Sequence, residues 1–594
     1  MSRPTRSLRS RRVRTALVVL SASTLAAAVI PIAATGSAAE PVATADCPEA
    51  FPVDDLTEGQ PVDGLTVSRG TEPDDITGEI VGRLDDGIAP GVDMIIAKLS
   101  GSEITNPDGS VNRGIWAGMS GSPVYSEDDR LIGAVAYGLS WSPSDYAGIT
   151  PAAEMYRVRD YGGATMSRTV EVPDSMARSM RADGASMAQT DQGFRRLRLP
   201  IAVSGGLSDK RIDRTAERFD RPAQRLISGP GAGLAEEPTD IVPGGNLAGS
   251  LSYGDMSLTG TGTATALCDD GILAFGHPFL WSGKSTLSMH GAKALYVETD
   301  QFFGSYKISN PTGPVGQITQ DRLAAILGIP GLTPPTTTVT SHVTATNGNE
   351  RDGTTKITQQ DWTDYISALH LLVNQDRVFD QIGKGSAAAG LTVDLTTAAG
   401  DSLRFSRSDV YASPWDISFA TVDDVWFQLY RILSNKFEKV EITDVHLTSD
   451  LDDAFHALRL GAVQRRIAGD WVTLDRDNTV RVPAGTTLVL RTRLLPRGES
   501  VDAARWVRTD VQVPNRPRRS GTLRVAGGGS IFTGTGGAGS LEEMLRLMRR
   551  APHNNDVVAS LRVRTGDGPV LRKATGTTDS HTSGWRWFDI RVIR

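Results

Sequence analysis

The first half of the chain alternates short apolar runs with tight polar turns. From residue 64 to about 158, runs such as DMIIAKLSG and RLIGAVAYGLS are separated by Gly, Asp and Pro. The pattern returns over 241–330, where GTGTATALCDDGILAFGHPFL places an Asp-Asp-Gly turn between two such runs. Short β-branched runs bounded by turn residues predict strands, and an Asp-Gly pair between them predicts a hairpin. We therefore expect two β regions, at 46–159 and 241–330.

The segment between these two regions has a different composition. Residues 160–240 are polar, rich in Arg and contain several Met. This pattern predicts a connector that crosses the surface, with a strand near 199–203 and a short helix at about 208–220.

A Pro/Thr-rich stretch, PGLTPPTTTVTS, marks a domain boundary near 330–341. Beyond it, 342–594 is predicted to be an α+β region in which strands alternate with three helices. The last two helices carry capping-box spacings, from Thr421 to Asp424 and from Ser540 to Glu543. The helices are expected at about 362–381, 422–436 and 541–550, with a β-sandwich-like module at about 470–530.

The N-terminus has the pattern of a secretory signal. Six Arg between positions 3 and 14 precede an apolar run over 16–30, and small residues follow at 37–39 and 43–45. We expect a signal peptide over 1–39, with cleavage after residue 39 or 45. The apolar run is too short for a permanent anchor, and no later run is long enough to span a bilayer. The mature protein is predicted to be secreted or in the cell envelope, with no membrane span.

Charge and cysteine content limit the partners and the compartment. The formal net charge is −7, which argues against a nucleic-acid partner. Two cysteines, Cys47 and Cys268, predict one disulfide in an exported chain, the alternative being two unrelated thiols. No Cys/His cluster has zinc spacing and no phosphate-binding loop is present, so we expect no cofactor.

The strongest candidate for chemistry is the segment Gly118-Met119-Ser120-Gly121-Ser122-Pro123. It matches the G-x-S-G-x-P turn of chymotrypsin-like serine peptidases. A nucleophilic serine needs a tight turn that exposes its hydroxyl and directs backbone N–H groups at a developing oxyanion. We expect Ser120 to be the nucleophile and the N–H groups of Gly118 and Ser120 to form the oxyanion hole. The alternative is a Gly/Ser turn without chemistry.

A serine nucleophile needs a base, and histidine is the usual one. The chain has eight histidines and none precedes Ser120, so a Ser–His pair must run serine first. Only His277 and His290 fall in the same predicted domain as Ser120. His277 lies in the Gly-His-Pro turn of FGHPF and is the candidate base, with His290 in reserve. The alternative for His277 is a turn residue that bonds backbone groups.

Two segments together resemble one family. GIWAGMSGSPVYSEDDRLIGAVAYG resembles the serine segment of the SpoIVB-type serine peptidases of the chymotrypsin-like clan, and GTGTATALCDDGILAFGHPF resembles their histidine segment. The resemblance covers roughly 64–328 and implies Ser120 as nucleophile and His277 as base. In that family the histidine precedes the serine, so the two halves are exchanged here. The PDZ module of that family is not recognisable in this chain.

The third residue of a triad orients the histidine and stabilises the imidazolium. Asp93 lies upstream of the serine, as the acidic residue of the family does, although the spacing does not align cleanly. Its alternative role is to cap a turn. The other candidates are Asp108, Asp269, Asp270 and Asp321.

These observations predict a mainly β protein with a split chymotrypsin-like double β-barrel core, followed by the α+β C-terminal region with its sandwich-like module. The predicted activity is serine-type hydrolysis of peptide bonds in a protein or peptide substrate. Two alternatives stay open: a non-catalytic cell-envelope binding protein that retains the peptidase-like fold, and a peptidase that cleaves only itself, within 160–240.

Overall fold

The protein is mainly β, as the sequence predicted, with 50% of residues in strands and 17% in helices in a computed structural model. None of the helices among the described residues has the length and apolar character to cross a membrane. The predicted signal peptide and its cleavage sites lie outside the described residues. The structure describes residues 47–139, 143–160, 169–197, 199–221, 225–234, 237–300, 304–497, 505–532, 534, 536–565 and 568–594.

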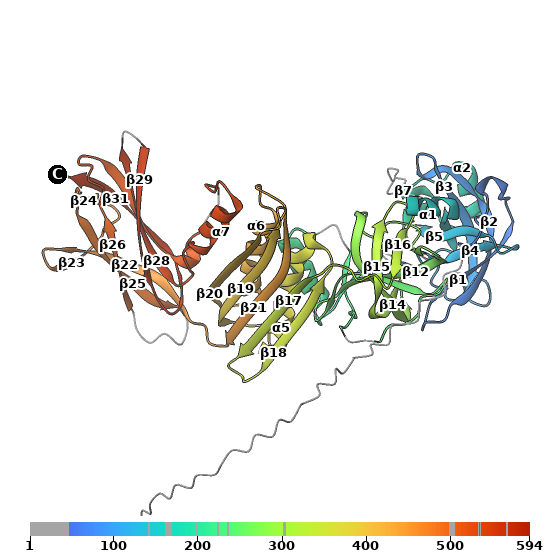
Figure 1. Ribbon diagram of the computed structural model, residues 1–594, viewed down its shortest axis with the longest axis horizontal. Helices are drawn as coiled ribbons and strands as arrows, with labels where there is room; N and C mark the ends of the chain where they lie inside the picture. The colour runs from blue at the N-terminus through green and yellow to red at the C-terminus, as the bar shows by residue number, and fades with distance from the viewer. Residues whose placement is uncertain are drawn as a thin grey trace, which may run out of the picture. The chain divides into compact units, whose positions relative to one another are not determined.

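Six antiparallel strands form a closed barrel in the first β region (Figure 1). Around the barrel, β1 pairs with β2 and β4, and β5 closes the ring by pairing with β4 and β6. The fourth strand returns beside the first after a long connection, which is the Greek-key arrangement. The strands are β1 (Pro61–Thr66), β2 (Asp74–Ala89), β3 (Val92–Gly101), β4 (Pro123–Ser126), β5 (Leu131–Leu139) and β6 (Tyr146–Pro151).

The second β region repeats this scheme of pairing. β11 pairs with β12 and β14, and the remaining pairs are β12 with β13, β13 with β16, β16 with β15, and β15 with β14. The six strands therefore also form a cycle of antiparallel pairs in the same order. They are β11 (Asn246–Gly254), β12 (Leu258–Cys268), β13 (Gly271–Ala274), β14 (Gly283–Glu298), β15 (Tyr306–Asp321) and β16 (Ile326–Pro330).

The residues between the barrels form ordered elements that pair with both of them, unlike the surface connector predicted from their polar composition. β7 and β8 extend the sheet of the first barrel, whereas β9 pairs with β12 of the second. The strand expected near 199–203 corresponds to β9 and the helix expected at 208–220 to α4, whereas β7, β8 and β10 lack a long apolar run and the sequence pattern does not reveal them. The elements are α1 (Ala152–Tyr156), η2 (Arg157–Asp160), β7 (Thr169–Val170), α2 (Asp174–Ala182), α3 (Met187–Gln192), β8 (Phe194–Arg196), β9 (Ile201–Val203), α4 (Asp209–Arg218) and β10 (Leu226–Ser228).

The sheet of the second barrel continues into the next part of the chain through the pairing of β11 with β18. The Pro/Thr-rich stretch at 330–341 therefore does not separate two sheets. α5 and α6 pack on strands of the continued sheet, and their apolar faces share one buried core with it (Figure 1). The elements are β17 (Thr337–Ala345), β18 (Glu350–Ile357), η3 (Gln360–Trp362), α5 (Thr363–Phe379), β19 (Gly385–Thr397), β20 (Ser402–Ser413), α6 (Ile417–Leu433) and β21 (Val440–Asp452).

The remaining strands form two sheets that share a second buried core over 457–594, which we call the C-terminal two-sheet module. It is longer than the 470–530 expected, because strands that follow α7 return to it. α7 itself contributes to the core of the preceding part, next to β20. The elements are β22 (Ala457–Ile467), β23 (Asp470–Thr473), β24 (Val480–Pro483), β25 (Thr487–Arg497), β26 (Arg505–Gln512), β27 (Ser520–Gly527), η4 (Gly528–Ser530), α7 (Leu541–Arg549), β28 (Asp556–Thr565), β29 (Gly568–Thr577), β30 (His581–Ser583) and β31 (Trp585–Ile593).

Candidate active site

The serine loop connects β3 to β4 and is built on two glycines with left-handed backbones. Gly118 has φ +101° and Gly121 has φ +99°, a conformation that L side chains rarely adopt. A Cβ on Gly121 would lie 1.9 Å from the carbonyl oxygen of Thr263, so only glycine fits. These two positions place Ser120 at the turn of the loop.

The second barrel holds this loop in place. Thr263 on β12 donates its backbone N–H to the Ser120 carbonyl (2.8 Å) and its hydroxyl to the Gly118 carbonyl (3.0 Å). Thr265 on the same strand donates its hydroxyl to the Gly121 carbonyl (2.7 Å). The conformation of the loop therefore depends on contacts between the two barrels.

The histidine turn connects β13 to β14, the same position in the second barrel that the serine loop has in the first. Phe275 (φ 71°) and Gly276 (φ 66°) both have left-handed backbones immediately before His277. Thr150 on β6 donates its hydroxyl to the Gly276 carbonyl (2.6 Å), so the first barrel in turn supports this loop. Strained backbone of this kind is often found at functional sites.

Ser120 and His277 meet between the barrels. The Ser120 Oγ lies 2.9 Å from the His277 Nε2, although 157 positions separate the two residues in the sequence. The His277 Nδ1 lies 2.7 Å from the Pro278 carbonyl oxygen. A carbonyl can only accept, so the Nδ1 carries the proton and the Nε2 is left to accept from the serine hydroxyl. This tautomer is the one that a general base requires.

Both side chains are fully enclosed. Ser120 is 0% exposed and His277 is 1% exposed. Burial lowers the pKa of His277 from 6.5 to about 3, and the nearby Arg196 guanidinium lowers it further. The imidazole is therefore neutral over the physiological range and can accept the proton of the Ser120 hydroxyl.

The position of the third triad residue is taken by the Pro278 carbonyl, and Asp93 does not occupy it. The Asp93 carboxylate lies in the β2–β3 hairpin, where it accepts the Asp86 N–H (2.9 Å) and faces Arg83 (3.5 Å). This is the turn-capping role given as its alternative.

Of the other acidic candidates, Asp321 is the one that contacts the histidine turn. It is fully buried at the end of β15, and its carboxylate accepts the backbone N–H groups of Phe279 (2.7 Å), Leu280 (2.8 Å) and Ser282 (3.1 Å). Burial raises the pKa of Asp321, whereas these hydrogen bonds oppose that shift. Asp321 is thus a positioning residue, since it acts on His277 through the backbone that follows it.

The remaining predicted candidates lie elsewhere. Asp108 accepts from Ser110 in an exposed turn, and Asp270 pairs with Arg159 (2.7 Å). Asp269 lies with Asp270 in the turn between β12 and β13. His290 lies on β14 with its Nδ1 2.8 Å from the Thr312 carbonyl, and no contact joins it to Ser120 within the described chain.

The backbone N–H groups of Gly118 and Ser120 have no hydrogen-bond acceptor among the described residues. The neighbouring N–H groups in the same loop are paired: Met119 donates to Trp116, and Gly121 donates to Val135. Buried backbone donors are nearly always satisfied. Two unpaired donors that flank a serine hydroxyl are what an oxyanion hole requires.

Lys307 is a buried neighbour of the serine loop that the sequence reasoning missed. Its backbone N–H donates to the Ala117 carbonyl (2.9 Å), and its Nζ donates to the side-chain oxygen of Asn246 (2.8 Å). Burial lowers the pKa of Lys307 to about 7. A lone lysine in a β-rich run carries no sequence motif, so only its enclosure distinguishes it.

Cys47 and Cys268 form a disulfide, with their Cα atoms 4.5 Å apart. Cys47 precedes the first barrel, and Cys268 is the last residue of β12 in the second. The bond therefore links the two barrels covalently on a strand that also carries Thr263 and Thr265.

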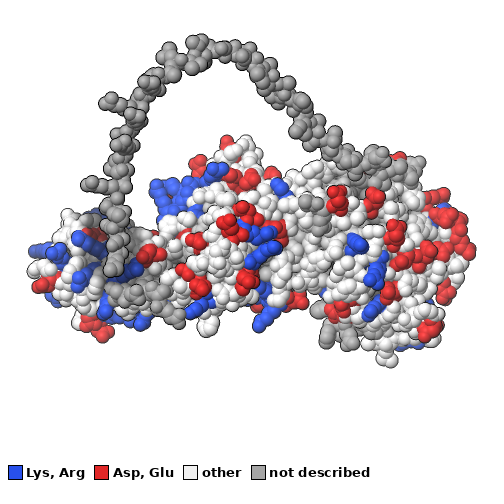
Figure 2. Space-filling model, turned by 90° about the horizontal axis from the view of Figure 1, so that it is seen from below, with Lys and Arg blue, Asp and Glu red and all other residues white. Residues whose placement is uncertain are grey.

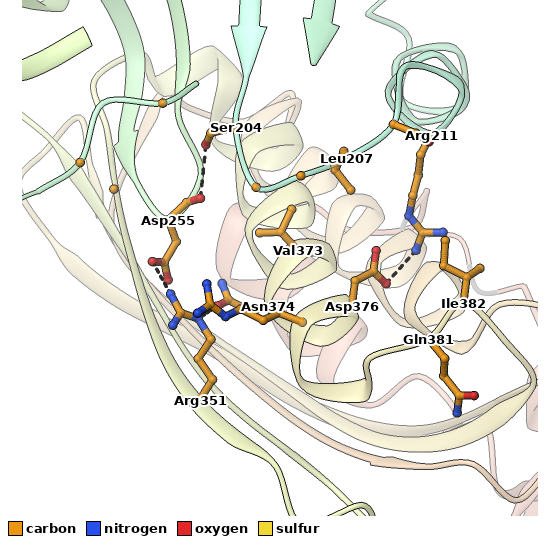
Figure 3. Close-up of a pocket in the computed structure, with 17 residues that line it drawn as sticks. Ser204, Leu207, Arg211, Asp255, Arg351, Val373, Asn374, Asp376, Gln381 and Ile382 are labelled. Carbon is orange, nitrogen blue, oxygen red and sulfur yellow. Dashed lines mark hydrogen bonds and ion pairs between the residues drawn. The ribbon is translucent and has the colours of Figure 1, made fainter. Parts of the chain in front are cut away.

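A separate cavity of about 750 Å³ lies between α4, α5 and the glycine-containing loops beside them (Figure 3). Four of its charged side chains form two ion pairs, Arg211 with Asp376 (2.9 Å) and Arg351 with Asp255 (2.7 Å). None of its lining residues belongs to the serine loop or the histidine turn. No group of three or more His, Cys, Asp or Glu side chains is placed to hold a metal ion in the described part of the chain.

Charge is divided unevenly along the chain. Residues 47–456 carry 32 Lys and Arg against 55 Asp and Glu, whereas 457–594 carry 24 against 12. On the face in Figure 2, acidic side chains are widespread with basic ones among them. The net charge of −7 is thus an average over an acidic part that holds the candidate site and a basic C-terminal module.

No family model, curated protein or solved structure matches this chain.

Proposed function

We propose that this protein is an exported serine endopeptidase with Ser120 as nucleophile and His277 as general base. The observation that carries the proposal is the 2.9 Å contact between Ser120 Oγ and His277 Nε2, with the proton of the imidazole held on Nδ1 by Pro278. The N–H groups of Gly118 and Ser120, which have no acceptor within the described part of the chain, add an oxyanion site.

The fold of this enzyme is, in our proposal, a chymotrypsin-like double barrel in exchanged order, similar to the SpoIVB-type peptidases. The support is that β1–β6 and β11–β16 have the same cyclic order of pairing, with one catalytic group in the β3–β4 connection and the other in the β13–β14 connection. Because the barrels are alike, exchanging their order in the chain leaves the geometry of a Ser–His pair unchanged.

The proposed reaction follows the usual two steps of acyl transfer. Ser120 attacks the substrate carbonyl while His277 Nε2 takes the hydroxyl proton, and the N–H groups of Gly118 and Ser120 bind the oxyanion. His277 then protonates the leaving amine, and water hydrolyses the acyl-enzyme with His277 again acting as base. Asp321 keeps the histidine turn in place throughout. No cofactor takes part.

The export of this enzyme is supported by two features. The N-terminal 45 residues have the pattern of a cleaved secretory signal. The Cys47–Cys268 disulfide is of the kind that persists in oxidising compartments.

The proposal is tested by labelling with a fluorophosphonate, which reacts with activated serines. We expect labelling of the wild-type protein at Ser120 and none in Ser120→Ala. In His277→Ala the loss of turnover should be on the order of 10⁶-fold, and the double variant should lose little more, because the two groups share one proton transfer.

Ser122→Ala is the matched control. Its hydroxyl lies in the same loop but bonds to Thr66 Oγ1 (2.8 Å) instead of the imidazole, so labelling should persist. Equal absence of labelling and of peptide hydrolysis in wild type and Ser120→Ala, with both proteins folded, would replace the proposal by the non-catalytic binding protein.

A further inference from the structure

A segment of the chain itself lies along the edge of β5 beside the serine loop. β8 pairs antiparallel with the end of β5, with Leu139 opposite Phe194, Gly138 opposite Arg195 and Tyr137 opposite Arg196. The next residue continues the ladder, since the Leu197 N–H donates to the Ala136 carbonyl (3.0 Å). An extended segment added to a sheet edge is a recurrent way in which peptides are bound.

The ladder places this segment directly beside the nucleophile. One step further along β5, Val135 exchanges hydrogen bonds with the serine loop, accepting from the Gly121 N–H (2.8 Å) and donating to the Ser122 carbonyl (2.9 Å). Along the edge of β5, Leu197 therefore pairs with the residue that directly follows the one bonded to the serine loop. Its carbonyl oxygen lies 3.4 Å from the Ser120 Oγ.

The side chain of Leu197 occupies an apolar position against the core of the first barrel. A Cβ built on Gly138 would lie 3.1 Å from the Leu197 Cδ2, so the glycine leaves the space in which this leucine packs. This apolar position resembles the specificity pocket of a peptidase. It accommodates one apolar side chain, and the carbonyl of the same residue faces the Ser120 hydroxyl.

We propose that the segment Phe194–Leu197 is held as the enzyme's own substrate and that Ser120 cleaves the peptide bond on the carboxyl side of Leu197. This inference rests on the proposed function. The pairing with β5 fixes the backbone, Leu197 fills the apolar position, and its carbonyl is the one that approaches Ser120.

The step is a hydrolysis. The Ser120 Oγ bonds to the Leu197 carbonyl carbon, and its proton passes to the His277 Nε2. The carbon–nitrogen bond to residue 198 breaks as His277 returns the proton to the leaving nitrogen. Water then attacks the Leu197–Ser120 ester, giving a carboxylate at Leu197, an amino group at residue 198 and a free Ser120.

Attack requires the Leu197 peptide to turn so that its oxygen leaves the Ser120 hydroxyl and enters the oxyanion site. The unpaired N–H groups of Gly118 and Ser120 are the donors that would receive it. Before the cut, the segment also occupies the site, because the Leu197 carbonyl lies against the Ser120 hydroxyl. Cleavage frees the end of this strand, and so opens the β5 edge to other extended substrates with an apolar side chain at the same position.

The experiment uses the purified full mature chain, analysed by gel electrophoresis and by mass spectrometry of the new termini. We expect wild-type protein to yield two fragments, one ending at Leu197 and one beginning at residue 198. The disulfide joins residues on opposite sides of this bond, so the fragments should separate only under reducing conditions. Ser120→Ala should remain intact.

Substitutions in the segment sharpen the test. Leu197→Asp places a charge in the apolar position, where burial of an unpaired charge is costly, and should slow the cut by a factor on the order of 100. Arg195→Ala changes an exposed side chain on the same strand and should leave the cut unchanged. If Leu197→Asp does not fold, Gly138→Val provides the same test. The valine side chain on β5 would fill the space in which the Leu197 side chain packs, so this variant should also slow the cut.

Failure of the inference is distinct from failure of the proposed function. A wild-type chain that labels with fluorophosphonate or cleaves added peptides but stays intact after Leu197 overturns the self-cleavage alone. A cut after Leu197 that also occurs in Ser120→Ala overturns it as well, since another protease is then responsible. Absence of labelling, hydrolysis and self-cleavage together overturns both.

Discussion

The two barrels have the same order of strand pairing, and the same connection in each barrel carries a different chemical group. The connection from the third to the fourth strand carries Ser120 in the first barrel and His277 in the second. Each loop is stabilised by the other barrel, the serine loop by Thr263 and the histidine turn by Thr150. Neither barrel contains a site by itself. The difference explains how a serine-first order in the chain is compatible with a Ser–His pair.

The largest stability effect is expected from breaking the covalent link between the barrels. The double variant Cys47→Ser/Cys268→Ser opens a loop of 221 residues and should lose about 2–5 kcal/mol of unfolding free energy, because the unfolded chain gains freedom. Urea unfolding measures this loss. Reducing agent should lower the stability of wild type and leave the double variant unchanged; an equal response of both proteins would contradict the explanation.

A smaller loss of stability is expected when a glycine is replaced by alanine in the serine loop or in the histidine turn, and the two losses should differ. Gly121→Ala forces a Cβ to within 1.9 Å of the Thr263 carbonyl oxygen and should cost about 2–4 kcal/mol. Gly276→Ala meets the Ala136 Cβ at 3.0 Å and the Ala134 Cβ and carbonyl oxygen at 3.3 Å, and it should cost about 1–2 kcal/mol.

Gly91→Ala separates steric overlap from backbone strain. Its φ is +75° and nothing lies within 4 Å of the added Cβ, so it should cost about 1 kcal/mol. Thermal unfolding of the three variants gives the ranking. Equal losses at positions 91 and 121 would mean that the contact with Thr263 does not constrain the serine loop.

Acid should weaken the second barrel before the first. His277 and His290 are buried in the second barrel, with pKa lowered by burial from 6.5 to about 3 and about 4, whereas the first barrel contains no histidine. The unfolded chain binds protons at these residues below pH 6.5 and the native chain does not, so their contribution is complete above pH 6.5 and falls as the pH falls towards 4. At pH 5 the loss is about 2 kcal/mol for each histidine.

Segment-resolved hydrogen exchange at pH 7 and pH 5 measures this difference. After correction for the intrinsic rate, peptides from β11–β16 should lose protection more than peptides from β1–β6. A His290→Gln variant should show a weaker pH dependence in the same peptides. Uniform loss of protection across both barrels would contradict the assignment to the buried histidines.

Much of the secondary structure follows from local sequence patterns. The β-branched runs and Asp-Gly turns predicted the strands of both barrels, and the helices expected at 208–220, 362–381, 422–436 and 541–550 correspond to α4, α5, α6 and α7 with ends shifted by a few residues. Ser540 caps α7 as predicted, but the capping box predicted from Thr421 is wrong, because α6 begins earlier with Asp416 as its cap and Thr421 lies inside the helix. These features depend on periodicity, capping residues and turn residues within a short window, so a single sequence carries them.

The chemical pair was also accessible from the sequence by itself. The G-x-S-G-x-P pattern predicted Ser120 as the nucleophile, and the absence of any earlier histidine left His277 and His290 as the candidate bases in the same region. An even number of cysteines in a chain that was predicted to be exported indicated the pairing of Cys47 with Cys268, which the structure contains. These inferences needed residue type, local turn chemistry and elimination, without distances.

Only the tertiary structure decided how the remaining residues relate to the pair. Asp93, Asp269, Asp270 and Asp321 are all acidic residues near turns, and nothing local shows which of them reaches the histidine turn. The structure brings Asp321 to the backbone after His277 because β15 pairs with both β14 and β16. The short strand at Phe194–Arg196 has no apolar run to reveal it, and its place beside Ser120 comes from pairing with β5 across more than fifty residues. Such long-range pairings depend on how the barrels close, and barrel closure is a property of the whole chain that no short window of sequence contains.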